Sequence, residues 1–154
     1  MPAASCGYQG APTKEVGATL LISYGPNLRV DVGFDRKWVW GPRHKKPPKP
    51  GIAQIDALVD TGAQESCIDN LLAGQLQLPM IDRRKVGGVT GVDEVNVHLG
   101  QICVPSLRFV IYGSFCALPL KESGLLYQVL LGRTFLNHCS MHYDGKTGSV
   151  TIAT

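Results

Sequence analysis

Glycine and proline interrupt this chain so often that long regular elements are excluded. The 154 residues include 18 glycines and 10 prolines, which follow no fixed period. The missing period rules out a collagen-like repeat, and because both residue types weaken the interior of a helix, the composition disfavours a long helical bundle. Hydrophobic residues still make up 44% of the chain, which is enough to build a core. We therefore expect an all-β domain of short strands with one or two short helices.

Strands are predicted wherever apolar residues alternate with polar ones, because successive side chains of a strand point to opposite faces. This pattern covers the segments 28–34, 52–59, 95–99, 102–111 and 149–152. The apolar segment 19–23 is expected to form a hairpin with 28–34, since the turn residues 25–27 lie between them. Residues 141–143 are expected to pair with 149–152 as a closing hairpin.

Two short helices are expected. Ser66 and Asp69 resemble a capping box in front of a run of leucines, and Gly74 limits the length of that helix. The second helix is expected over residues 134–138, after the apolar run that ends at Leu131.

Composition also divides the chain. Residues 1–16 are small and polar, and we expect a flexible N-terminal tail before a domain that covers residues 17–154. Within that domain, residues 41–51 are rich in proline and lysine, which predicts an exposed loop insertion. This loop is interpreted either as a solvated basic loop or as a docking patch for an acidic partner.

Several other classes of protein are excluded. The net charge of +3 is too small and too scattered for a nucleic-acid partner, and no apolar run is long enough to span a membrane or to act as a signal peptide. We expect a cytoplasmic protein without a cofactor or a metal ion, because the cysteines and histidines lack ligand spacing. The cysteines are read as free, buried thiols. The five cysteines are Cys6, Cys67, Cys103, Cys116 and Cys139, and the four histidines are His44, His98, His138 and His142.

The informative segment is the triplet Asp60-Thr61-Gly62. An apolar strand, predicted over 52–59, runs directly into it and places Asp60 where the buried sheet meets a loop. Glycine lets the backbone turn sharply and approach a ligand closely, and the threonine hydroxyl can hydrogen-bond within the loop. The same triplet can also be an ordinary turn, so the flanking strand is what favours a functional interpretation.

Three separated segments resemble, in order, motifs of the retropepsin-like aspartic proteases, the single-lobe enzymes of retroviruses with cellular and bacterial relatives. Residues 58–63, Leu-Val-Asp-Thr-Gly-Ala, resemble the catalytic loop of that family. Residues 86–92, Val-Gly-Gly-Val-Thr-Gly-Val, resemble its flap, and residues 129–133, Val-Leu-Leu-Gly-Arg, resemble the element before its helix. The resemblance spans residues 52–152, with a first strand within 19–34.

The resemblance implies a single-lobe retropepsin-like acid protease fold and an aspartic endopeptidase that hydrolyses extended polypeptides. The family's chemistry uses two carboxyls, one that activates water and one that polarises the scissile carbonyl. This chain holds one Asp-Thr-Gly triplet and is too short for a second lobe. The second carboxyl must come from another copy of Asp60, so we expect a C2 homodimer.

By resemblance, each site residue has an expected role. Asp60 carries the catalysis, Thr61 interlocks with its mate across the dimer axis, and Gly62 lets the substrate backbone lie close. Flap residues and pocket walls are expected to bind the substrate: Leu58, Ala63, Gln64, Gly87, Gly88, Val89, Gly91 and Leu130. Gly132 and Arg133 are expected to support the catalytic loop.

Two points are left open. The family pairs the arginine at Arg133 with an acid four residues after the catalytic aspartate, where this chain has Gln64. Either Glu65 or backbone carbonyls could bind Arg133 instead.

The alternative function is a non-catalytic peptide-binding or dimerisation module, motivated by Gln64 and by the basic loop. The intact Asp-Thr-Gly triplet argues against it, because a binding module needs no carboxyl pair at its centre.

Overall fold

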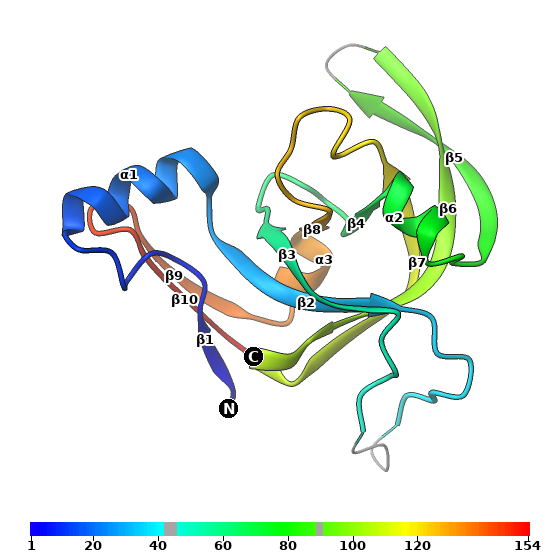
Figure 1. The fold of residues 1–154 in the computed structure, drawn as a ribbon, viewed down its shortest axis with the longest axis horizontal. Coiled ribbons are helices and arrows are strands. Elements are labelled where there is room, and N and C mark those ends of the chain that lie inside the picture. Colours follow the sequence, from blue (N-terminus) through cyan, green and yellow to red (C-terminus); the bar gives the residue numbers. More distant parts are fainter. Residues whose placement is uncertain (42–45, 89–90) are drawn as a thin grey trace.

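The computed structural model describes residues 1–41, 46–88 and 91–154, which form two β-sheets with short helices beside them (Figure 1). The strands are β1 (Ala3–Ser5), β2 (Asn27–Gly33), β3 (Ile52–Val59), β4 (Cys67–Asp69), β5 (Met80–Gly88), β6 (Gly91–Val104), β7 (Phe109–Leu118), β8 (Val129–Leu131), β9 (Ser140–Asp144) and β10 (Ser149–Ala153). The helices are α1 (Lys14–Tyr24), α2 (Asn70–Gln75), α3 (Arg133–Leu136) and the 3-10 turn Pro105–Leu107. The prediction of an all-β domain with short helices is confirmed.

The larger sheet has the strand order β2-β3-β8-β4-β7-β6-β5, and β2 also pairs with β6. Because β2 pairs with both β3 and β6, the larger sheet is curved and partly closed. In its middle, β3 runs parallel to β8, β8 runs antiparallel to β4, and β4 runs parallel to β7. The smaller sheet, β1-β10-β9, is antiparallel and joins the two ends of the chain.

Two apolar clusters fill the interior. The main cluster packs both sheets and the three α-helices together, and its fully buried side chains include Val30, Val32, Ile102, Leu131, Phe135 and Ile152. Each such side chain stabilises the fold by about 1.5–3 kcal/mol through its burial. The second cluster lies between β3, β4, β6, β7 and β8, and comprises Cys67, Val95, Val97, Cys116, Leu120 and Leu130.

Several predicted elements occur where the sequence indicates. The strand predicted over 52–59 coincides with β3, and the closing hairpin is formed by β9 and β10. The short helix predicted over 134–138 is α3, which begins one residue earlier. The segment 95–99 forms the middle of the long strand β6.

The segment 19–23, predicted as half of a hairpin, belongs instead to helix α1. The Thr13 hydroxyl accepts the backbone N–H of Val16 at 3.2 Å, which caps the start of the helix. Gly25 ends the helix with a φ of +72°, and its N–H donates to the carbonyl of Leu21. Capping at both ends therefore outweighs the strand-like apolar run.

The N-terminal residues 1–16, predicted as a flexible tail, are packed against the body. Strand β1 pairs with β10, so that Ala4 lies opposite Ile152. Cys6 follows at 2% exposure, and its N–H donates to the carbonyl of Val150 at 3.0 Å. Backbone pairing with β10 therefore holds this segment in place. The small side chains of residues 1–16 do not reveal this pairing in the sequence.

The helix predicted from Ser66 begins later, at Asn70, because strand β4 intervenes. Asp69 is the N-cap, and its carboxylate accepts the N–H of Leu72 at 3.3 Å. Ser66 does not cap this helix, since its Oγ accepts the N–H of Gly132 at 3.1 Å. The capping-box interpretation is therefore wrong.

The strand predicted over 102–111 is broken into β6 and β7. Pro105 opens a 3-10 turn, and Arg108 after it takes a φ of +49° in the left-handed region. Proline cannot donate to a strand ladder, which explains why the pairing stops there.

Part of the 41–51 insertion, residues 42–45, lies outside the described residues. In the remainder, Lys46 and Lys49 are exposed, and the Lys49 N–H donates to the Asp35 carboxylate at 2.9 Å. Among the described ranges, no helix is long and apolar enough to cross a membrane.

Candidate active site

Asp60 directly follows strand β3, in which Ile55, Ala57 and Val59 are buried. Val59 before it pairs with Leu131 of β8, and both side chains are buried. The Asp60 N–H donates to the carbonyl of Leu131 at 2.9 Å, so the sheet fixes the backbone up to this residue. The half-buried side chain of Asp60 then projects from the edge of a rigid element.

The turn after Asp60 holds the carboxylate in place. The Gly62 N–H donates to Asp60 Oδ1 at 2.9 Å, and the Ala63 N–H donates to the Asp60 carbonyl at 3.3 Å. A Cβ at Gly62 would lie 3.1 Å from Asp60 Oδ1, which is a tight contact. Thr61 and Gly62 are exposed, so the top of this turn is open to a ligand or to another chain.

The segment after β8 supports residues 60–65, which we call the Asp60 loop. The Arg133 N–H donates to the Ala63 carbonyl at 2.9 Å, and the Thr134 N–H donates to the Gln64 carbonyl at 3.0 Å. A Cβ at Gly132 would lie 2.5 Å from the Glu65 carbonyl oxygen. Only glycine allows this close approach of the two backbones.

Arg133 and Glu65 do not pair with each other. Arg133 Nη1 donates to the Thr61 carbonyl at 2.8 Å, which ties α3 to the Asp60 loop. Glu65 binds a different cation, Arg84 of β5, with Arg84 Nη1 at 2.8 Å from Glu65 Oε2. Of the two alternatives that the sequence left open, the backbone carbonyl is the partner of Arg133.

Strands β5 and β6 form the hairpin at the place predicted for a flap, and Figure 1 shows it arching away from the body. Gly87 lies opposite Val92, and Gly88 lies opposite Gly91 at the end of the ladder. Val89 falls outside the described residues. Among the described residues, a Cβ at Gly87 or Gly91 would meet no atom within 4 Å.

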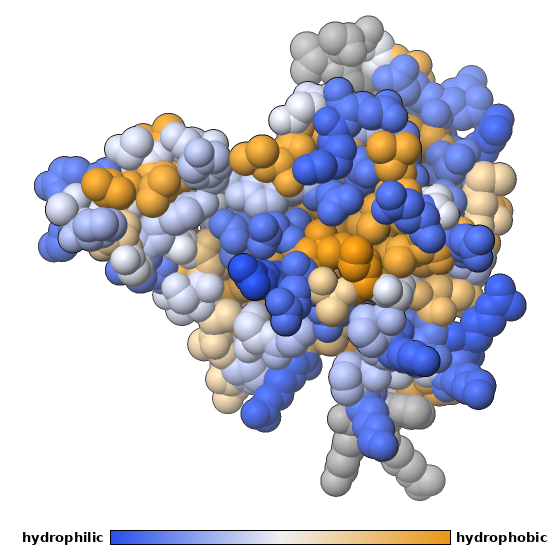
Figure 2. All heavy atoms as spheres, in the orientation of Figure 1, coloured by the Kyte–Doolittle hydropathy of each residue, from blue (hydrophilic) through white to orange (hydrophobic). Residues whose placement is uncertain are grey.

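The predicted pocket walls belong to the second apolar cluster in part. Leu130 is a buried member, and the half-buried Leu58 packs against it together with Val86 of the hairpin. Ala63 is half-buried, whereas Gln64 is exposed. In Figure 2 apolar surface gathers in the middle of the drawn face, where β3, β4 and β8 lie in Figure 1.

Two thiols lie in this cluster beside the Asp60 loop. Cys67 of β4 and Cys116 of β7 are partners in the parallel ladder, and both are buried. Burial raises the pKa of Cys67 to about 12, and the neighbouring Cys116 and Glu65 add to the effect. Burial also raises the pKa of Cys116. Such thiols stay protonated and are poor nucleophiles.

Sequence reasoning missed Arg84 as a residue of this site. It lies in the polar run Asp82-Arg83-Arg84-Lys85, which looks like an ordinary solvated strand face. Its guanidinium nevertheless reaches Glu65 and lies 3.7 Å from the Cys116 sulfur. The one signal in the sequence was Glu65 itself, an acid next to the position where the family carries its own.

No family model matches this chain, and no curated protein matches it. Among solved structures, the chain is similar to the protease of simian foamy virus, with 15% identity and a TM-score of 0.44 over 72% of this chain and 91% of that chain. It is also similar to the EIAV protease complexed with the inhibitor HBY-793, with 19% identity and a TM-score of 0.44 over 73% of this chain and 85% of that chain.

Proposed function

We propose that this protein is an aspartic endopeptidase that works as a homodimer, with Asp60 of each subunit in one shared site. The observation that carries the proposal is the geometry of the Asp60 loop. A strand fixes the backbone of Asp60, and the Gly62 N–H holds one carboxylate oxygen at 2.9 Å. A carboxyl held in this way, directly after a strand whose last residues pack in the core, is oriented for chemistry rather than for packing.

A second carboxyl is required for peptide hydrolysis, and a second copy of the chain is its source. In the described part of the chain, Asp60 shares no hydrogen bond with another carboxylate, and the nearby Glu65 is bound to Arg84. Thr61 and Gly62 are exposed, which leaves the top of the loop free to meet its mate. A twofold axis through this point brings the two Asp60 carboxyls together.

The two carboxyls divide the work of hydrolysis. Held side by side, they retain one proton between them, because two adjacent negative charges repel each other. The ionised carboxyl takes a proton from water, and the resulting hydroxyl attacks the scissile carbonyl. The protonated carboxyl donates its proton to the carbonyl oxygen, and a tetrahedral diol forms. As the C–N bond breaks, the departing nitrogen takes the proton that the first carboxyl removed from water, and a hydroxyl of the diol returns a proton to the second carboxyl.

The β5–β6 hairpin and the second apolar cluster are suited to an extended peptide. Leu58 and Leu130 offer apolar contacts next to the Asp60 loop, and the hairpin is attached to that loop through Arg84. Closure of the hairpin excludes water and supplies backbone donors to the substrate.

The test compares a substitution of the proposed catalytic aspartate with a substitution of another aspartate nearby, in strand β3. Asp60→Asn is compared with Asp56→Asn, which changes an exposed aspartate of β3 four residues earlier. Cleavage of a mixed peptide library is followed by mass spectrometry, and the mass of each protein in solution is measured. We expect a dimer whose cleavage is abolished by Asp60→Asn and retained by Asp56→Asn.

A mixing experiment tests the shared site itself. Inactive Asp60→Asn subunits are exchanged into the wild-type protein at increasing fractions. If each site needs two Asp60 carboxyls, activity falls with the square of the wild-type fraction. A linear decrease would show that each subunit works alone, and a dimer that never cleaves would favour the binding module.

A further inference from the structure

A cleft of about 860 Å³ lies apart from the Asp60 loop and from residues 80–98, which form the paired part of the β5–β6 hairpin, since none of its lining residues falls in either range. Its walls come from the β2–β3 connection, from β6 and β7, and from the region of α3. The volume falls within the range of ligand pockets in proteins. The cleft therefore needs an explanation of its own.

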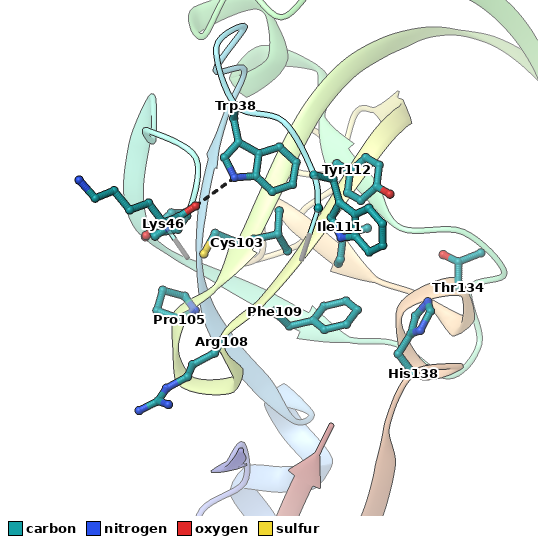
Figure 3. A pocket seen from close by; sticks show the side chains of 15 residues that line it. Trp38, Lys46, Cys103, Pro105, Arg108, Phe109, Ile111, Tyr112, Thr134 and His138 are labelled. Carbon is teal, nitrogen blue, oxygen red and sulfur yellow. Dashed lines mark hydrogen bonds between the residues drawn. The ribbon is translucent and has the colours of Figure 1, made fainter. Parts of the chain in front are cut away.

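The cleft is walled by ordered aromatic rings (Figure 3). Trp38 packs edge-on against Tyr112 with ring centroids 5.5 Å apart, and Trp40 lies 6.1 Å from the same ring. The Trp38 indole N–H donates to the Lys46 carbonyl at 3.1 Å, which fixes the ring. Trp40 is nonetheless 64% exposed, and Tyr112 is 49% exposed. Large aromatic rings that cluster at a surface are typical of binding sites.

Charge is distributed unevenly around the rings. In Figure 3, Lys46 and Arg108 lie on one side of the cleft, and Thr134 and His138 lie on the other. The ion pairs among residues 1–41, 46–88 and 91–154 are Arg29–Asp56 and Arg84–Glu65, so neither Lys46 nor Arg108 has an acidic partner there.

The lining also contains one carboxylate, Asp31, which is already engaged. Its Oδ1 accepts the backbone N–H of Gln54 at 2.9 Å. Among the described lining residues, two cations therefore stand against one carboxylate, and this excess of one positive charge favours an anionic ligand.

We propose that this aromatic cleft binds an extended peptide segment of a partner protein in which proline or phenylalanine stands next to acidic residues. Proline and aromatic side chains pack against exposed indole and phenol faces, and carboxylates pair with Lys46 and Arg108. The net charge of the whole chain is only +3, which disfavours nucleic acid as the ligand. The proposal goes beyond proteolysis and does not depend on it.

The two tryptophans of the chain both line the cleft, so tryptophan fluorescence reports its occupancy. The probe is a synthetic nine-residue peptide in which glutamate alternates with proline and phenylalanine. It is titrated into the full chain carrying Asp60→Asn, so that cleavage does not interfere. We expect a saturable change in emission that weakens as salt is raised.

Single substitutions test whether the peptide binds in the aromatic cleft. We expect Trp40→Ala to weaken binding about tenfold or more, as is common for an aromatic contact at the centre of an interface. We expect Lys46→Glu to weaken binding and to reduce its dependence on salt. The matched controls are Tyr143→Ala, another exposed aromatic, and Lys14→Glu, another exposed cation, and both should bind within about twofold of the parent protein. For Trp40→Ala and Tyr143→Ala, binding is followed with a fluorescein-labelled copy of the peptide.

The proposal would be overturned by any of three results. One is the absence of saturable binding. A second is equal binding of a peptide in which lysine replaces glutamate. A third is tighter binding of a single-stranded oligonucleotide than of the peptide, which would assign the rings to base stacking instead.

Discussion

Arg84 on strand β5 donates to Glu65 of the Asp60 loop at 2.8 Å, and this pair connects the hairpin to the strand end that carries Asp60. The two residues are 19 positions apart, and one lies in a loop whereas the other lies in a strand. Their side chains are 44% and 47% exposed. A pair of this kind contributes less than about 1 kcal/mol to stability, so its significance lies in the position of the hairpin.

Arg84→Gln is expected to loosen the hairpin and to leave the fold intact. If the proposed function holds, the KM for a peptide substrate rises several-fold, and the free energy of unfolding changes by less than about 1 kcal/mol. Steady-state kinetics and urea unfolding measure the two quantities. Arg83→Gln, on the adjacent exposed residue, is the control, and an equal rise in its KM would contradict the specific role of Arg84.

Gly132→Ala is expected to destabilise the protein by about 1–3 kcal/mol, because the new methyl group would lie 2.5 Å from the Glu65 carbonyl oxygen. The backbone of the Asp60 loop would have to move away. Gly74→Ala in helix α2 is the control, since a Cβ there meets no atom within 4 Å. This control should gain about 0.5–1 kcal/mol from helix propensity, and equal losses in both variants would contradict the close approach.

The part of the site that is local in sequence could be predicted from it. In the strand 52–59, the buried residues Ile55, Ala57 and Val59 alternate with less buried ones, and the strand ends directly before Asp60 as predicted. The Gly132-Arg133 element also lies where expected, directly after β8. In each case the evidence lies within one short segment of the sequence. For the strand it is the alternation of buried side chains, and for the second element it is the glycine directly after an apolar run.

The contacts that could not be predicted join segments far apart in the chain. The pairing of Arg84 with Glu65 depends on how the hairpin curves over the sheet, and exposed charges show no periodic pattern. The N-terminal segment is held in place by backbone pairing between β1 and β10. The small side chains of this segment do not indicate such pairing. The apolar run 19–23 does not by itself distinguish a strand from a helix, and the caps at Thr13 and Gly25 lie outside that run.

The buried cysteines predict a loss of stability at alkaline pH. Burial raises the pKa of Cys6 to about 11, and burial together with the charge of Asp31 raises the pKa of Cys103 to about 11. Burial raises the pKa of Cys67 to about 12. In the unfolded chain these thiols ionise near pH 9, so the unfolded state binds fewer protons above that pH. The stabilising effect is complete below about pH 9 and decreases as the pH rises toward 11.

Urea unfolding across this pH range measures the decrease. Cys6→Ala removes one of the titrating groups, so its stability should fall less steeply between about pH 9 and 11 than that of the parent protein. Alkylation by iodoacetamide at neutral pH should also be slow until urea unfolds the chain, because the thiolate is the reactive form. Rapid labelling of Cys6 in the folded protein would contradict its burial.

Asp69→Ala is expected to weaken both α2 and the loop that precedes β8. Asp69 is fully buried, and its two carboxylate oxygens accept the N–H groups of Leu72 at 3.3 Å and Lys121 at 3.0 Å. Alanine would leave both donors without this acceptor, at a cost of about 2–4 kcal/mol. Asp69→Asn keeps one carbonyl oxygen and should lose less. Hydrogen exchange at Leu72 and Lys121 is the direct readout, and unchanged protection in Asp69→Ala would show that the carboxylate does not hold these segments.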